Sequence, residues 1–66
     1  MKHNKRLTNH LNKAYEHNEK ARAIILHELQ RENDDNTISL LVQYKLQTLD
    51  VKFKLKELLE KVDELL

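Results

Sequence analysis

The chain contains neither glycine nor proline among its 66 residues. These two residue types most often interrupt or end helices, so their absence favours long, uninterrupted helical segments. Two such segments are predicted, at about residues 4–32 and 37–65, and only the polar residues 33–36 separate them. Because short connections favour antiparallel neighbours, the sequence predicts a single all-α domain over residues 1–66, folded as an antiparallel two-helix hairpin.

A two-helix hairpin has no enclosed interior, and chains of this length bury only about 60% of their unfolded surface. The chain has no cysteine, which excludes disulfides and thiolate metal sites as sources of stability. Oligomerisation is the remaining common way for a chain this small to gain stability. The sequence therefore predicts a homodimer in which two hairpins form a four-helix bundle, with a parallel or antiparallel arrangement of the hairpins, or a higher oligomer, left open.

The charge pattern also favours the antiparallel hairpin. Residues 1–20 carry five basic and two acidic side chains, and residues 57–66 carry one basic and four acidic ones. In the same way, residues 21–36 are acidic on balance and residues 37–56 are basic. An antiparallel hairpin places the basic residues 1–20 beside the acidic residues 57–66, and the acidic residues 21–36 beside the basic residues 37–56. Such charge complementarity contributes to the orientation and specificity of pairing more than to stability.

The first predicted helix carries one apolar stripe with the three- and four-residue spacing of a coiled-coil seam. Its members are Leu7, Leu11, Ala14, Asn18, Ala21, Ile25 and Leu29. Asn18 is the polar member. A polar residue at a seam can fix the register of two helices by pairing across it, and the alternative is that Asn18 points to solvent at the edge of the seam.

The second predicted helix carries apolar residues on two roughly opposite sides. The first helix can cover one of them, so the other is expected to be buried by a second copy or by a protein partner. The predicted oligomer or partner interface consists of Ile38, Val42, Leu46, Leu49, Phe53, Leu55, Leu58, Val62 and Leu65.

The outer flank of the first helix is basic and has no acidic residue before Glu28. Its candidate nucleic-acid-binding residues are Lys2, Arg6, Asn9, His10, Lys13, His17 and Lys20. Such a row can contact phosphates along a nucleic-acid groove. Alternatively, the chain's own acidic end neutralises it, since Arg6 and Lys13 would lie level with Glu64 and Glu57 in the hairpin.

Metal binding and catalysis lack the residues they require. His3, His10 and His17 are seven residues apart, or about 10.5 Å along a helix, whereas two ligands of one ion need a spacing of three or four. Ser39 has no histidine near it in the sequence, and no glycine-rich loop is present to bind phosphate. We therefore expect no metal, no cofactor and no enzymatic activity.

The function predicted from these features is that of a small regulator or adaptor acting through protein–protein interaction and self-association. A nucleic-acid-binding regulator using the basic flank is the alternative. In length and architecture the predicted hairpin resembles the small Rop-type RNA-binding hairpins, with no shared residue motif. No apolar run approaches the roughly 18 residues of a membrane span, so a cytoplasmic location without membrane contact is expected.

Overall fold

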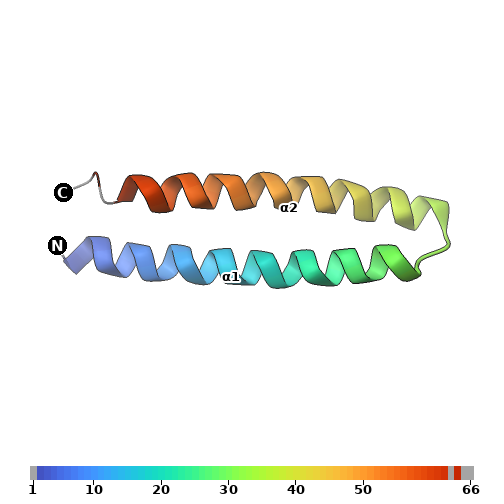
Figure 1. Ribbon diagram of the computed structural model, residues 1–66, viewed down its shortest axis with the longest axis horizontal. Helices are drawn as coiled ribbons and strands as arrows, with labels where there is room; N and C mark the ends of the chain where they lie inside the picture. Colours follow the sequence, from blue (N-terminus) through green and yellow to red (C-terminus); the bar gives the residue numbers. More distant parts are fainter. Residues whose placement is uncertain (1, 63, 65–66) are drawn as a thin grey trace.

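The computed structural model describes residues 2–62 and 64, with side chains described from residue 5 onward. Helix α1 spans Lys2–Arg31 and helix α2 spans Asp35–Val62. The two helices lie side by side and run in opposite directions, so that Lys2 and Val62 are at the same end of the molecule (Figure 1). This confirms the predicted all-α hairpin.

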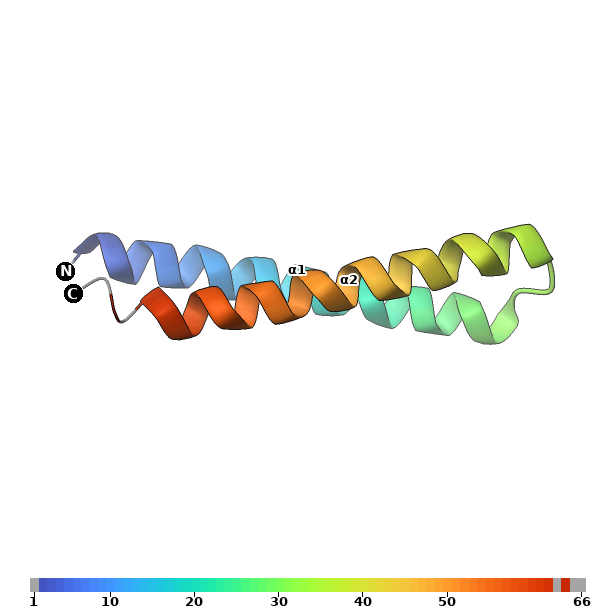
Figure 2. The ribbon, with the colours of Figure 1, turned by 90° about the horizontal axis from the view of Figure 1, so that it is seen from above.

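The hairpin is a rod rather than a compact domain. Its principal extents are 50 × 14 × 12 Å and its Cα radius of gyration is 15.3 Å. A compact chain of this length would have a radius of gyration of about 11 Å. Figure 2 shows that α1 and α2 cross near their midpoints, as expected for helices packed along a narrow seam. Most side chains therefore remain near the surface.

The turn is tighter than predicted, and α2 begins two residues earlier. Asp34 is the N-cap: its Oδ2 atom accepts hydrogen bonds from the backbone N–H of Thr37 at 2.9 Å and from the hydroxyl of Thr37 at 2.8 Å. These two bonds, the hydroxyl contributing most, hold the pKa of Asp34 below its ordinary value. Glu32 Oε1 accepts from the backbone N–H groups of Asn33 and Asp34, and no described residue uses the left-handed conformation that residues 33–36 would tolerate.

The seam on α1 differs from the predicted stripe. The half-buried members on α1 are Thr8, Leu11, Tyr15, Asn18, Arg22, Ile25 and Leu29. Leu7, Ala14 and Ala21 were predicted to lie in the seam, and this was wrong: all three are exposed, Leu7 by 41%. Thr8, Tyr15 and Arg22 lie in the seam instead, because two helices that stay in contact along their length follow a repeat of about 3.5 residues.

On α2 the corresponding row is apolar at both ends and polar in the middle. Its half-buried or buried members are Ile38, Leu41, Thr48, Lys52, Leu55, Leu59 and Val62. Val62 is 3% exposed and is the one buried apolar side chain among the described residues. The hairpin therefore has almost no core of its own.

Candidate interaction surfaces

Asn18 joins the two helices at the middle of the seam. Its Nδ2 atom donates a hydrogen bond to the backbone carbonyl of Thr48 at 3.0 Å, and the contact is partly buried. The side chain thus points towards α2 and not into solvent. The acceptor is a single backbone carbonyl, so this bond is made at one relative height of the two helices. The register role of Asn18 stays a prediction.

Three charged residues lie beside Asn18. Lys52 Nζ is 3.5 Å from Glu19 Oε1, and an Arg22 guanidinium nitrogen is 3.8 Å from the same oxygen. The side chains of Arg22 and Lys52 are only 13% and 23% exposed. Glu19 Oε1 and Arg22 Nε are buried without a hydrogen bond. Burying polar atoms in this way costs free energy, so the middle of the seam stabilises the hairpin poorly.

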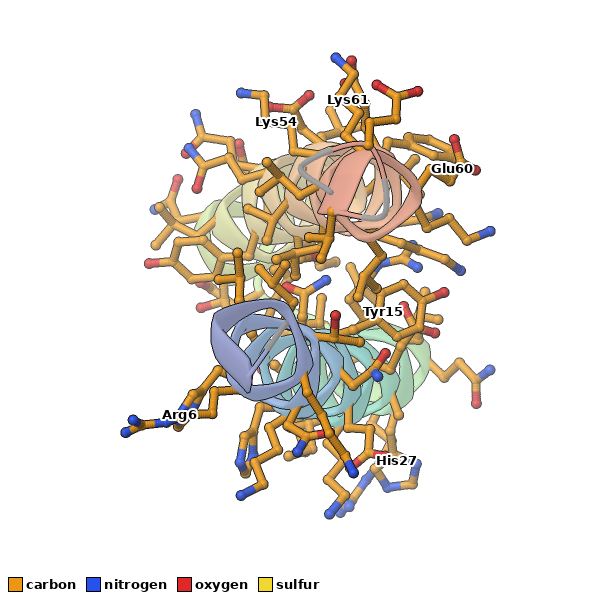
Figure 3. All side chains as sticks on the ribbon, turned by 90° about the vertical axis from the view of Figure 1, so that its left-hand side faces the viewer. Arg6, Tyr15, His27, Lys54, Glu60 and Lys61 are labelled. Carbon is orange, nitrogen blue, oxygen red and sulfur yellow. The ribbon has the colours of Figure 1, made fainter. Side chains whose placement is uncertain are left out.

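Over the same stretch, the large apolar side chains of α2 lie outside the seam. We call Val42, Leu46, Leu49 and Phe53 the outer stripe. Leu46 and Phe53 are 60% and 58% exposed, Val42 is exposed, and Leu49 is half-buried. Their spacing of four, three and four residues confines them to about 60° of the helix surface. Glu60 follows Phe53 by seven residues and marks this side of α2 in Figure 3.

The predicted interface residues therefore separate into two groups. The buried or half-buried members are Ile38, Leu49, Leu55 and Val62. The exposed members are Val42, Leu46, Phe53 and Leu58. Leu65 lies outside the described residues. Of the predicted interface residues, Val42, Leu46, Phe53 and Leu58 are thus the described ones left exposed to a second chain.

A second exposed apolar row lies on the other side of the hairpin. It contains Leu40, Tyr44, Val51 and Leu58 of α2. Near the end opposite the turn, a shallow groove of about 210 Å³ is lined by Leu7, Leu11, Leu58, Lys61 and Val62. The prediction did not include Leu40 or Leu7 in the interface, although both are large and apolar.

The basic flank of α1 points away from α2. In Figure 3, Arg6 and His27 project from the side of α1 opposite α2. Lys13 and Lys20 follow Arg6 at seven-residue intervals and so lie in the same row. The described side chains of this flank, which are all exposed, are Arg6, Asn9, His10, Lys13, His17 and Lys20. The side chain of Lys2 lies outside the described part.

The acids near the end of α2 do not neutralise this flank within the part of the hairpin that is described. Glu57 pairs with Lys61 of its own helix at 2.8 Å, and Glu60 projects sideways from α2, on the opposite side of the rod from Arg6 (Figure 3). The hydrogen bond between Glu57 and Lys61 lowers the pKa of the carboxyl and raises the pKa of the ammonium. Lys54 pairs with Asp50 in the same way at 2.8 Å. Among residues 5–62, the one ion pair between the helices is that of Lys52 with Glu19.

Neither metal chemistry nor a membrane span is indicated by the described residues. No group of three or more His, Asp or Glu side chains among them lies close enough to hold an ion. None of the described helical segments is long and apolar enough to cross a membrane.

The fold is that of an antiparallel two-helix hairpin. Comparisons with known protein families, with curated proteins and with solved structures give no match for this chain. Its function must therefore be inferred from the arrangement of its own residues.

Proposed function

We propose that this protein is a small, non-enzymatic regulator or adaptor that acts through protein–protein interaction and works as a homodimer, two hairpins forming a four-helix bundle. The observation that supports this most directly is that polar and apolar side chains have exchanged their usual sides at the middle of α2. There, Thr48 and Lys52 face α1 while Leu46 and Phe53 face outward. Large apolar side chains grouped on an exposed helix surface are typical of an interface.

The exposed area fits a second copy of the chain. The hairpin exposes 5459 Å². A compact monomer of 7.9 kDa would expose about 4,400 Å². The excess of roughly 1,000 Å² is slightly more than the 800 Å² or so that each partner buries in a standard interface. One further copy is thus sufficient to bring the exposed surface per chain to an ordinary value.

Sedimentation equilibrium tests the proposal. We expect a mass of twice 7.9 kDa at micromolar concentration, and a thermal midpoint that rises with protein concentration, because association stabilises the folded state by mass action. A folded monomer whose midpoint is independent of concentration between 1 and 100 μM, a range of about two decades, would refute self-association.

A second function, nucleic-acid binding, is favoured by the unpaired basic flank. Arg6, Lys13 and Lys20 are exposed and form no ion pair among the described residues, and neither does Arg31, which lies eleven residues beyond Lys20 on the same side of α1. Four cations that each neutralise one phosphate would give a slope of log affinity against log salt of roughly −3 to −4 on a duplex. The net charge of +1 gives little general attraction, so binding would depend on this flank.

Fluorescence anisotropy with labelled RNA and DNA duplexes tests this function. The double variant Lys13→Glu, Lys20→Glu should abolish binding. Lys54→Glu, Lys61→Glu is the matched control, since it changes net charge equally but alters α2 lysines that are already paired with acids. Equal losses in both variants would show general electrostatic attraction, and no binding of the unmodified protein at low salt would exclude this function.

A further inference from the structure

We infer that a second copy of this chain docks along the outer stripe of α2 in antiparallel orientation, with a two-fold axis passing between Gln47 and Thr48. The inference deepens the self-association proposed above and rests on it. It specifies the surface, the direction of the partner helix and the residues that meet.

The outer stripe is the more continuous of the two exposed apolar surfaces. Neighbouring members are three or four residues apart, so their side chains touch along the helix, with Cβ atoms about 5–6 Å apart. On the opposite side, Leu40 and Tyr44 are four residues apart, but Tyr44, Val51 and Leu58 repeat every seven residues and are about 10.5 Å apart. A partner helix seated on that row would therefore cover polar surface between successive apolar contacts.

The spacing of the outer stripe makes it self-complementary. The intervals of four, three and four residues read the same in both directions along α2. An antiparallel copy therefore places Val42 opposite Phe53 and Leu46 opposite Leu49, twice over. A two-fold interface requires this property, because each surface must match itself. It also pairs the largest side chain with the smallest, which evens the distance between the helices.

The lysines that follow the stripe favour the antiparallel direction. Lys52, Lys54 and Lys56 make this stretch of α2 basic, with Lys52 paired to Glu19 of α1, Lys54 paired to Asp50, and Lys56 in no described ion pair. A parallel copy would place the two basic stretches side by side. With the two-fold axis near residue 47, residue 54 lies level with residue 41 of the partner, so the basic stretches are about 20 Å apart along the helices. That separation exceeds the screening length of about 10 Å at 0.1 M salt.

Docking on the stripe is compatible with the hairpin itself. At 100° per residue, the stripe is centred about 110° around α2 from the row that faces α1. Helix α2 can therefore contact α1 and the partner's α2 at the same time, which produces four helices in one assembly. The basic flank of α1 stays uncovered, since Arg6 projects away from α2 (Figure 3).

The first experiment compares the two apolar surfaces. Leu46→Asp should raise the dissociation constant of the dimer by about 100-fold or more, because the two-fold axis introduces two buried carboxylates. Leu58→Asp is the matched control, half-exposed on the opposite side, and should change the constant by less than about threefold. Helical circular dichroism reports whether each hairpin stays folded. Dissociation by Leu58→Asp but not by Leu46→Asp would overturn the assignment of the stripe.

The second experiment measures direction. Because the chain has no cysteine, Glu60→Cys gives one spin-label site per copy. In the antiparallel dimer, residue 60 lies level with residue 35 of the partner, so the two labels are roughly 35–40 Å apart. A parallel dimer would bring them within about 15 Å. A short distance in a stable dimer overturns the antiparallel inference alone, whereas a monomeric wild-type protein also refutes the self-association on which it rests.

Discussion

Replacing Arg22 with leucine should stabilise the protein. The Arg22 side chain is 13% exposed, its Nε atom has no hydrogen bond, and its nearest acid, Glu19, is 3.8 Å away. A fully buried leucine contributes about 1.5–3 kcal/mol. The aliphatic stem of arginine already supplies part of this packing. We therefore expect a net gain of about 1–2 kcal/mol, in keeping with other exchanges of buried charge for apolar side chains.

Thermal unfolding followed by circular dichroism checks this value. In a chain of this size, 1 kcal/mol shifts the midpoint by roughly 4–8 °C, so Arg22→Leu should unfold about 5–15 °C higher at equal protein concentration. Lys20→Leu is the control, because it introduces the same side chain on the exposed flank of α1 and should change the free energy of unfolding by less than about 0.5 kcal/mol.

The companion variant Glu19→Gln separates charge from packing. It keeps the size of the side chain but leaves Arg22 and Lys52 without their acid, and it should destabilise the protein by about 1 kcal/mol, given the partial exposure of Glu19. If Arg22→Leu lowered the thermal midpoint, the ion pair of Arg22 with Glu19 would stabilise the folded state by more than the burial of the guanidinium destabilises it. The view that the seam is weakest at its middle would then be wrong.

Two further predictions concern the centre of the seam and the N-cap of α2. Asn18→Ala removes the hydrogen bond to Thr48 and should cost about 1 kcal/mol, whereas Asn18→Leu should raise the thermal midpoint yet broaden amide NMR signals as alternative registers become populated. Asp34→Ala removes the cap of α2 and should lower the midpoint at neutral pH. Because the folded state lowers the pKa of Asp34, the stabilisation is complete above about pH 4 and is lost as the pH falls through the lowered value. Midpoints of wild type and Asp34→Ala measured down to pH 2, roughly two units below the ordinary value, should therefore converge; a constant difference would count against a charged cap.

The hairpin could be predicted from the sequence because its determinants are local. The absence of Gly and Pro, together with one polar break, defines two helices whatever surrounds them. The details of the seam are not local. A wheel drawn at 3.6 residues per turn selects Ala14 and Ala21, whereas two helices that stay in contact along their length follow a repeat of about 3.5. Arginine also scores as polar, although the stem of Arg22 packs well.

The candidate interface could be predicted only in part, for a related reason. Apolar residues occur on both sides of α2, and the sequence does not state which side meets α1. That choice depends on the total fit of the two helices, including the Asn18 hydrogen bond and the ion pair of Lys52 with Glu19. Once the choice is made, Leu46 and Phe53 are exposed and Leu55 is half-buried. Hydrophobicity alone ranks these three residues alike.

The outer stripe of α2 and the basic flank of α1 should be separable by mutation, because they lie on different sides of the rod (Figure 3). Effects at sites more than about 10 Å apart without shared partners usually add. Leu46→Asp should therefore abolish the dimer without changing the charge of the flank, and Lys13→Glu, Lys20→Glu should leave the mass at twice 7.9 kDa. If the lysine variant instead dissociates the dimer, the flank is contacting acids of the second copy. The acidic end of α2 would then neutralise the flank of the other hairpin, which it does not do within the described residues of one hairpin. The flank would no longer be unpaired, and the proposal of nucleic-acid binding would lose its main support.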